Sequence, residues 1–290
     1  MRKFTLVTDS SCDLPSEILT ELNVRALPLC FNFKEEQYMD EKDESSMKYT
    51  DFYRRMREGE VATTSAVPVG VFEQYFEEKA QKGQDVLYIA FSSGLSTTCS
   101  SAMIAAKAVS ERYPERKLFV VDSLAASLGQ GLFVYLVAKK SDEGGSIEEV
   151  RDYAEGLKLH ICHFFTVDDL KYLKRGGRIS AATALVGGLL NIKPLLHTDD
   201  EGHLVSIGKA RGRKASIQAL ADSVKGNDLP ETREIAFICH ADCLQDAQLL
   251  ADILKKDGFK KIVIWYTGAV IGAHSGPGTL SVFFYVGGKR

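Results

Sequence analysis

The sequence has few of the features that mark a secreted or membrane-spanning protein. Its six cysteines are scattered over 290 residues without a CxxC pair, which favours free thiols in a reducing compartment. The N-terminal MRKFTLVTDSS leads straight into a strand-like run and has no signal-peptide pattern. The longest apolar segment, residues 179–196, is interrupted by Asn191, Lys193 and Pro194, so it does not read as a membrane span. We expect a cytoplasmic protein with no integral membrane segment and at most transient membrane contact.

An excess of either charge is also missing. The chain has 36 Lys and Arg against 39 Asp and Glu, a net charge of −3, so no overall field attracts nucleic acid or acidic lipid. Its basic clusters are not interleaved with the aromatic residues that single-strand binding uses. We therefore expect no nucleic-acid partner, and any anion must be bound by a local site.

Motifs of self-sufficient catalysis are absent too. The sequence contains no GxSxG elbow, no Walker loop and no GxGxxG. Cysteine and histidine lie close together in residues 160–163 and 239–243, but their spacing matches no common zinc site. Neither a metal nor a cofactor is expected, and no catalytic residue is assigned.

What the first half does contain is a regular alternation of strand and helix patterns. Apolar runs of strand length are followed by turns and then by helical periodicity, which is typical of parallel pairing with right-handed crossovers. The predicted strands are residues 3–8, 24–33, 85–90 and 117–122, and the predicted helices are residues 13–22, 49–57, 69–81, 96–113 and 124–138. This order predicts an α/β domain with a parallel sheet.

The rhythm changes in the second half. Residues 192–198 and 204–211 predict two strands joined by the hairpin signal Asp199-Asp200-Glu201-Gly202. The other predicted strands are residues 160–167, 234–239, 261–266 and 280–285, and the predicted helices are residues 168–173, 181–190, 216–224 and 241–256. We predict two domains, an N-terminal α/β domain at residues 1–155 and a mixed-sheet α/β domain at residues 156–290. A ligand between them is the default expectation.

Hydroxyl-rich segments follow the predicted strands of the first half. Residues 8–11, 91–96 and 121–125 all lie where ligands bind in open α/β sheets, outside the carboxyl ends of the strands. Such residues also cap helices, and that structural role is favoured for Asp9, Asp13 and Asp122. For Thr64 and Ser93 the pattern leaves capping and anion binding equally open.

Two further groups stand out. The block VDDLKYLKRGGRIS and the basic residues Lys209, Arg211, Arg213 and Lys214 flank an apolar helix pattern. They are either a solvated face or a surface for a phosphate or an acidic partner. The segment HSGPGT, which begins at His274, is either an ordinary turn or a place where small residues let a ligand approach the backbone.

The order of these motifs is specific. TDSSCDLP, TTS before a helix, SSGLS, VDSLAASLGQG, VDDLKYLKRGGRIS, NIKPLL, KARGRKA and HSGPGTL occur in a sequence that resembles the DegV family from end to end. The resemblance implies a two-domain α/β fold with a fatty acid buried between the domains. Some members are binding subunits of a bacterial fatty acid kinase in phospholipid metabolism. They present the acyl carboxylate to a separate kinase subunit, which phosphorylates it with ATP.

The resemblance also implies the site residues. The carboxylate-binding groups map to Thr64, Ser65, Ser93, Gly94 and Ser96, with His274 beside them. Arg178 and Arg211 map to basic positions that face the kinase subunit or the phosphate, and His274 is a candidate to assist the transfer. The chain departs from the family in the segment Ala66-Val67-Pro68-Val69, where the family has a glutamine and a differently placed proline, and at Thr97. The loop over the carboxylate therefore differs from the family pattern.

The expected functions differ in class. As a fatty-acid-binding subunit, the chain would gain roughly 12 kcal/mol of gross burial from a sixteen-carbon tail, at about 0.8 kcal/mol per methylene. The carboxylate would need charge-assisted hydrogen bonds, and residues 181–190 would form a tunnel wall or a core helix. The alternative is a self-contained phosphotransferase or hydrolase that acts on a small anionic substrate with the serine-rich turns and His274. A lipid sensor and a lipid transporter are the remaining options.

Overall fold

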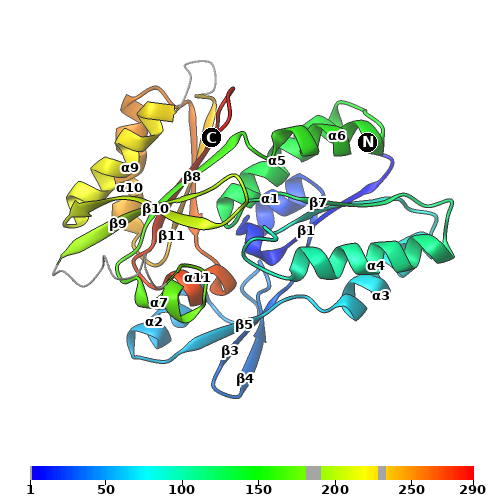
Figure 1. Ribbon diagram of the computed structural model, residues 1–290, viewed down its shortest axis with the longest axis horizontal. Coiled ribbons are helices and arrows are strands. Elements are labelled where there is room, and N and C mark those ends of the chain that lie inside the picture. Colours follow the sequence, from blue (N-terminus) through cyan, green and yellow to red (C-terminus); the bar gives the residue numbers. More distant parts are fainter. Residues whose placement is uncertain (1, 181–190, 228–232) are drawn as a thin grey trace.

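A computed structural model describes residues 2–180, 191–227 and 233–290 of the chain. The strands in these ranges form three sheets, one of four strands, one of six and one of three. Figure 1 shows the four-stranded and six-stranded sheets side by side, with helix α5 between them. The predicted apolar helix at residues 181–190 lies outside the described residues.

The four-stranded sheet is parallel throughout, as the sequence predicts. Its strands pair in the order β2-β1-β6-β7. They are β1 (Thr5–Asp9), β2 (Arg25–Leu27), β6 (Val86–Ala90) and β7 (Leu118–Asp122). Their carboxyl ends meet at one edge, which is where the hydroxyl-rich segments follow.

Helices cover both faces of this sheet because its strands alternate apolar side chains between the faces. Leu6, Leu87 and Val121 pack under one group of helices, while Val7 and Tyr88 pack under the other. The first group is α1 (Ser16–Glu21), α5 (Leu128–Asp142) and α6 (Ile147–Leu157), and the second is α3 (Val69–Gln81) and α4 (Thr98–Arg112). A short 3-10 turn, η1 (Ser10–Cys12), follows β1.

The six-stranded sheet is mixed. It runs in the order β10-β9-β8-β13-β11-β12, and within it β11 and β12 pair in parallel while the other neighbours are antiparallel. The strands are β8 (Ile161–Thr166), β9 (Ile192–Thr198), β10 (Leu204–Arg211), β11 (Ile235–His240), β12 (Lys261–Tyr266) and β13 (Leu280–Tyr285). The predicted hairpin at residues 199–202 joins β9 to β10.

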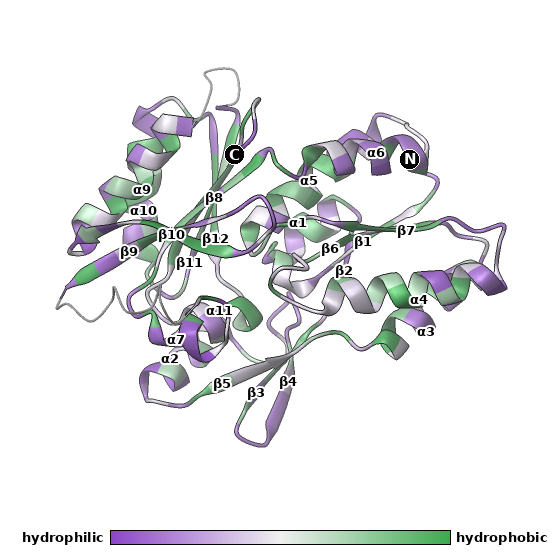
Figure 2. Cartoon of the chain, in the orientation of Figure 1, coloured by the Kyte–Doolittle hydropathy of each residue, from purple (hydrophilic) through white to green (hydrophobic). Residues whose placement is uncertain are grey.

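The two faces of the mixed sheet have different partners. One face packs on α9 (Arg213–Asn227) and α10 (Leu244–Lys256). On the other face, Ile161, Phe237 and Phe283 share a core with α5 from the first half of the chain. Figure 2 shows the hydrophobic residues along the mixed sheet and the hydrophilic residues on α6 and α7. The two sheets are therefore joined through one apolar layer.

A small antiparallel sheet was not expected. It consists of β3 (Cys30–Phe33), β4 (Glu36–Met39) and β5 (Ala62–Ser65), in the order β4-β3-β5. It packs with α2 (Tyr49–Arg57) and α11 (Ala269–Ser275), while α7 (Lys171–Arg175) contributes Tyr172 to the same apolar cluster. The sequence prediction of one strand at residues 24–33 is wrong, because Pro28 lacks the N–H that a continuous ladder requires. The TTS motif at residues 63–65, which the sequence places before a helix, lies in strand β5.

Helix α6 was also missed, although its signal is in the sequence. Ser146 accepts a hydrogen bond from the backbone N–H of Glu149, and the Glu149 side chain accepts one from the Ser146 N–H. This reciprocal cap is a helix-start pattern. The strands of the parallel sheet precede residue 155 and those of the mixed sheet follow it. The division into domains at residues 1–155 and 156–290 stays a prediction, since α11 and the small sheet pack across it.

Candidate ligand-binding cavity

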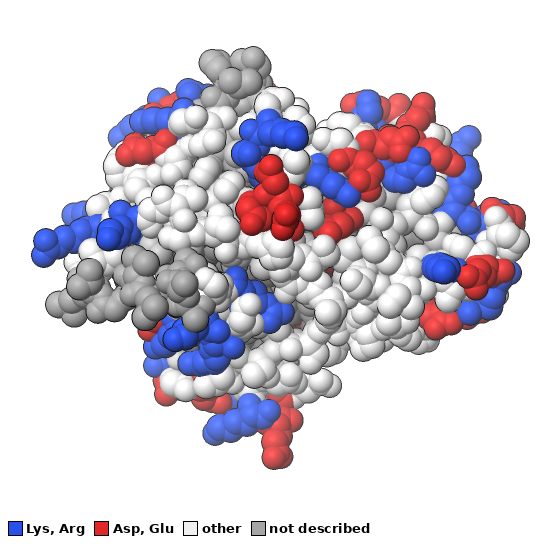
Figure 3. Space-filling model, in the orientation of Figure 1, with Lys and Arg blue, Asp and Glu red and all other residues white. Residues whose placement is uncertain are grey.

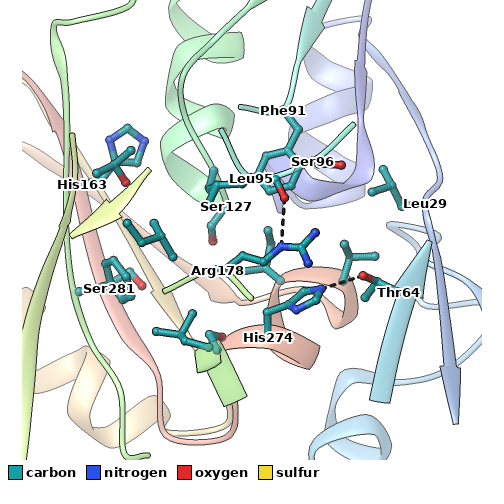
Figure 4. A pocket seen from close by; sticks show the side chains of 18 of the residues that line it. Leu29, Thr64, Phe91, Leu95, Ser96, Ser127, His163, Arg178, His274 and Ser281 are labelled. Carbon is teal, nitrogen blue, oxygen red and sulfur yellow. Dashed lines mark hydrogen bonds between the residues drawn. The ribbon is translucent and has the colours of Figure 1, made fainter. Parts of the chain in front are cut away.

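A cavity of about 490 Å³ lies between the carboxyl edge of the parallel sheet and the mixed sheet. Its wall is built from segments far apart in the chain, as Figure 4 shows. The loop after β6 contributes Phe91 and Leu95, the start of α5 contributes Ser127, and α11 contributes Val270. Aromatic and aliphatic side chains make up much of the lining, and polar side chains come from both the parallel-sheet side and the mixed-sheet side.

One polar group joins β5 to α11. Thr64 Oγ1 lies 2.7 Å from His274 Nε2, although the two residues are 210 positions apart. Burial, together with the nearby Arg178 charge, lowers the pKa of His274 to about 4, so the imidazole is neutral at physiological pH. The backbone of Gly176 runs against this ring, and a Cβ at Gly176 would collide with His274 Nδ1. The glycine in the RGGR segment thus makes room for the histidine.

Arg178 forms part of the same wall. Its Nε donates to Leu95 O at 3.0 Å, and its NH1 donates to Gly176 O at 2.5 Å. Burial lowers the pKa of Arg178, but a guanidinium remains charged at any physiological pH. No carboxylate among the described residues lies within ion-pair distance of it. The cavity therefore has a cation whose counter-ion the described chain does not supply.

The loop after β6 is held by the hairpin of the second sheet. Ser92 Oγ donates to Gly202 O at 2.9 Å and accepts from the Gly94 N–H at 3.2 Å. Ser93 is exposed at the cavity wall, whereas Gly94 lies against the backbone of Glu201 and Gly202. The amide of Gly94 is therefore already used inside the protein.

Three carboxylates, of which Asp9 and Asp13 are buried, fix the loops behind the cavity, which confirms the structural role predicted for them. Asp9 accepts hydrogen bonds from Tyr88 Oη at 2.6 Å and from the Phe91 N–H at 3.0 Å. Asp13 accepts one from Ser127 Oγ at 2.6 Å. Asp122 accepts from the Ser93 N–H at 3.2 Å. These bonds set the positions of the residues that form the cavity wall.

The structure brings most of the predicted site residues together. Thr64, Ser65, Ser93, Ser96, Arg178 and His274 all line the cavity. Gly94 and Arg211 are not among the described lining residues, and Arg211 is exposed at the end of β10. The ligand-binding role of these residues stays a prediction.

Sequence reasoning missed other wall residues. Ser275 lines the cavity, and its buried hydroxyl has no hydrogen-bond partner in the described ranges. It was next to His274 in the HSGPGT motif, where the histidine alone was assigned. Ser127 was also missed, although it lies in the quoted motif VDSLAASLGQG. His163, Thr198 and Ser281 were missed as well, and they carry no local motif. Register and tertiary packing bring them to the wall.

Basic residues continue outward from the cavity. Figure 3 shows Lys and Arg gathered over α7, whose sequence contributes Lys171, Lys174 and Arg175. A separate, polar hollow beside this helix is lined in part by Arg57, Lys171 and Arg175. The Arg178 side of the cavity is therefore next to a positively charged surface.

Neither a metal cluster nor a membrane-spanning helix is found in the part of the chain that the structure describes. Within residues 2–180, 191–227 and 233–290, no three His, Cys, Asp or Glu side chains are grouped to hold a metal ion. No helix in these ranges is long and apolar enough to cross a membrane.

The fold and the cavity define a class: an α/β protein that encloses a largely apolar space with a polar, cationic group at one side. The chain belongs to the DegV family. Residues 3–287 match the family model described as "Uncharacterised protein, DegV family". A DegV domain-containing protein of Clostridium perfringens is 43% identical over 285 residues, which are 98% of each chain.

Solved structures agree with this assignment. A fatty-acid-binding DegV family protein from Thermus thermophilus has a TM-score of 0.86 and 34% identity, covering 99% of this chain and 100% of its own. A DegV lipid-binding protein from Thermotoga maritima has a TM-score of 0.87 and 28% identity, with the same coverage. The α/β fold with a parallel N-terminal sheet and a mixed C-terminal sheet is thereby confirmed.

Proposed function

We propose that the chain binds a long-chain fatty acid in this cavity, with the carboxylate beside Thr64, His274 and Arg178. The observation that carries the proposal is the meeting of Thr64, Ser93, Arg178 and His274 in one wall of a largely apolar cavity. Ligand cavities commonly have volumes of about 300–1,000 Å³, and this one falls in that range. The relatives from Thermus thermophilus and Thermotoga maritima, named for fatty acid and lipid binding, support the same ligand.

The tail supplies the bulk of the expected affinity. A sixteen-carbon chain gains roughly 12 kcal/mol from burial at about 0.8 kcal/mol per methylene. Association and ordering cost about 4 kcal/mol or more, so the tail contributes at most about 8 kcal/mol net, which corresponds to a reversible ligand of about micromolar affinity. Leu29, Phe165, Leu204 and Phe283 provide apolar surface along the wall.

The carboxylate requires donors, because it only accepts hydrogen bonds. Thr64 and Ser93 offer hydroxyl groups, and Arg178 has N–H groups beyond those bonded to Leu95 and Gly176. The neutral His274 carries one N–H, so it acts as a donor or as an acceptor for Thr64, according to its tautomer. Ser65, Ser96 and the Gly94 amide remain second-line candidates, since the Gly94 N–H is bonded to Ser92.

The chain is proposed to work with a separate kinase subunit rather than alone. Binding places an acyl oxygen beside Arg178, close to the basic surface over α7. A partner would supply ATP and magnesium, and Arg178, Arg211 and His274 would face the transferred phosphate. This arrangement belongs in the cytoplasm, where ATP is available, and it includes no cofactor in this chain. Turnover of ATP or an ester by the purified chain would favour the self-contained alternative.

Mass spectrometry of the purified protein tests the ligand. Native spectra should contain a stoichiometric mass that matches a fatty acid, and organic extraction should release it. A Thr64→Ala/Ser93→Ala double variant should carry less lipid, while an Arg211→Ala variant should carry as much as the parent. If the parent contains no lipid and cannot be loaded with palmitic or oleic acid, the proposal fails.

A further inference from the structure

The mixed-sheet side of the cavity has polar side chains that a saturated acyl tail, which forms no hydrogen bonds, does not need. Strands β8, β9 and β13 present His163, Phe165, Thr198, Ser281 and Phe283 to the cavity. Figure 4 shows His163 and Ser281 on the opposite side of the view from Thr64, with the Ser281 hydroxyl directed toward the cavity. Polar side chains therefore lie at both sides of the same space.

One atom in each of these polar side chains has no hydrogen-bond partner among the described residues: His163 Nε2, Thr198 Oγ1 and Ser281 Oγ. His163 is 1% exposed, and its Nε2 has no hydrogen-bond partner in the described ranges. Thr198 is 1% exposed and Ser281 is 5% exposed, and neither hydroxyl is bonded to a described residue. More than nine in ten buried polar groups in proteins are satisfied, so the unpartnered His163 Nε2 is unusual. Together with the Thr198 and Ser281 hydroxyls, which line the cavity, it marks a place for an outside partner.

Strand register puts the three side chains in one patch. His163 of β8 lies opposite Phe283 of β13, and Phe165 lies opposite Ser281. On the other side of β8, Phe164 pairs with His197, so the next position along brings Thr198 beside His163. Opposite side chains in a sheet are about 5 Å apart, and diagonal ones are about 7–8 Å apart. One small polar group on a ligand is therefore within reach of His163 together with either Thr198 or Ser281.

The surroundings of His163 favour a neutral ligand group. Its Nδ1 lies 3.0 Å from Ile161 O and 3.3 Å from Arg290 Nη1. Nε2 is therefore an acceptor when Nδ1 donates to Ile161 O, and a donor when Nδ1 accepts from Arg290. Burial lowers the pKa of His163 well below its usual range, and the nearby Arg290 charge lowers it further. The absence of a side chain at Gly129 provides the room for the ring, because a Cβ there would collide with Nε2. A hydroxyl group suits this patch, since it can donate and accept, and so pairs with the imidazole in either tautomer and with Ser281 or Thr198.

We propose that His163, Thr198 and Ser281 form a second polar subsite that accepts an acyl chain bearing a hydroxyl group. This inference rests on the proposed fatty acid binding and extends it to hydroxylated fatty acids. The carboxylate site would hold the acid group, and the subsite would select the position of the hydroxyl along the tail.

The test uses full-length delipidated protein and competition against a fluorescent fatty acid. The competitors are stearic acid and a series of hydroxystearic acids whose hydroxyl moves along the chain. A wholly apolar wall would weaken each hydroxylated acid by about tenfold or more, because the hydroxyl is buried unpaired. The subsite predicts one isomer that binds at least as tightly as stearic acid.

Variants separate the subsite from the rest of the cavity. Ser281→Ala and Thr198→Val should each weaken the preferred isomer by about fivefold to tenfold relative to stearic acid. Thr166→Val is the matched control, since Thr166 is on β8 with an unpartnered hydroxyl but does not line the cavity. Its ratio of affinities should equal that of the parent.

Two results overturn the inference in different ways. If stearic acid binds but each hydroxylated isomer binds at least about tenfold more weakly, the subsite does not exist although fatty acid binding stands. The same conclusion follows if the Ser281→Ala and Thr198→Val variants keep the parent ratio. If neither stearic acid nor any isomer competes, the proposed function has failed and the inference falls with it.

Discussion

Two charged clusters lie next to the cavity, one buried and one half-buried, and they differ in whether their charges are paired. Behind Ser127, Lys42 forms ion pairs with Asp13 at 3.6 Å and Asp40 at 2.9 Å, and it donates to Tyr49 Oη at 3.0 Å. At the cavity wall, Arg178 lies beside a neutral His274, and no carboxylate of the described residues lies within ion-pair distance of it. The first cluster is complete within the protein, whereas the second lacks an anion.

This difference suggests a structural role for the first cluster and a ligand-binding role for the second. A buried charge that is fully paired holds chain segments together, and removing its partner is costly. A half-buried cation without an anion gains free energy from a ligand that supplies the negative charge. The Lys42 cluster connects the loop before α2 to the turn after β1, so its role is to hold the small sheet in place. The Arg178 cluster is the one that we propose to bind a carboxylate.

The largest expected effect is on the balanced cluster. Lys42→Met leaves Asp13 and Asp40 buried without a cation, and it should lower the free energy of unfolding by about 3–5 kcal/mol. Urea denaturation measures this change. A loss below about 1 kcal/mol would show that the cluster is not a structural ion pair. The Arg178→Met variant is the comparison, because removing an unbalanced cation should cost little stability.

In the Arg178 cluster, His274 should make the free energy of unfolding depend on pH. The folded pKa of His274 is about 4 against 6.5 for a free histidine, so the unfolded chain binds more protons between these values. The free energy of unfolding should therefore rise with pH from about 4 to 6.5, by up to about 3 kcal/mol from this residue.

The variant His274→Gln isolates that contribution. His163 and His240 also have lowered pKa values through burial, and their slopes have the same sign and remain in the variant. Subtracting the two stability profiles gives the part that belongs to His274. Bound fatty acid should reduce the slope, since a carboxylate beside the imidazole raises its pKa. Equal slopes in the parent and the variant would place His274 in a solvated environment.

The Arg178 charge should matter for ligand affinity. Arg178→Met should weaken palmitic acid binding by about 2–3 kcal/mol, or about thirtyfold to a hundredfold, because a charge-assisted bond is lost. Calorimetry on delipidated protein measures the affinity. Arg211→Met removes an exposed arginine outside the cavity wall and is expected to retain the parent affinity. Equal losses in both variants would point to general electrostatic attraction instead of a local contact.

The smallest effect is expected from one hydroxyl. Thr64→Val keeps the side-chain shape and removes the group 2.7 Å from His274, so palmitic acid should bind about 1 kcal/mol more weakly. The loss should be smaller in a His274→Gln background if the two residues act together, which a double-mutant cycle measures. Strictly additive losses would show that Thr64 and His274 act independently.

The sequence predicted the parallel sheet well because its strands are short apolar runs followed by turns. Strand β6 is fully buried and was placed to within one residue of its start. The small sheet was not predicted, since Pro28 divides an apparently continuous strand and Thr64 lies in a strand of polar composition. Packing against α2 and α11, rather than local propensity, keeps β5 in place.

The cavity residues that the sequence predicted belong to short sequence motifs, whereas several that it missed do not. Thr64, Ser93 and His274 belong to short motifs, so the sequence identified them, and the structure places them in one wall. Ser281 and Thr198 occupy ordinary strand positions, and their role depends on the register of three strands. The alternation of residues along a strand does not show which face of a mixed sheet will line a cavity. The same holds for Gly176, whose need for a bare backbone is visible only beside His274.

The most direct test of the account compares palmitic acid with hexadecanol on the delipidated protein. The two ligands share the tail, and only the acid provides the anion that the Arg178 cluster lacks. The account predicts that the acid binds at least about tenfold more tightly near neutral pH, and that this preference disappears in an Arg178→Met/Thr64→Val variant. Equal affinities of the acid and the alcohol for the parent protein would contradict it.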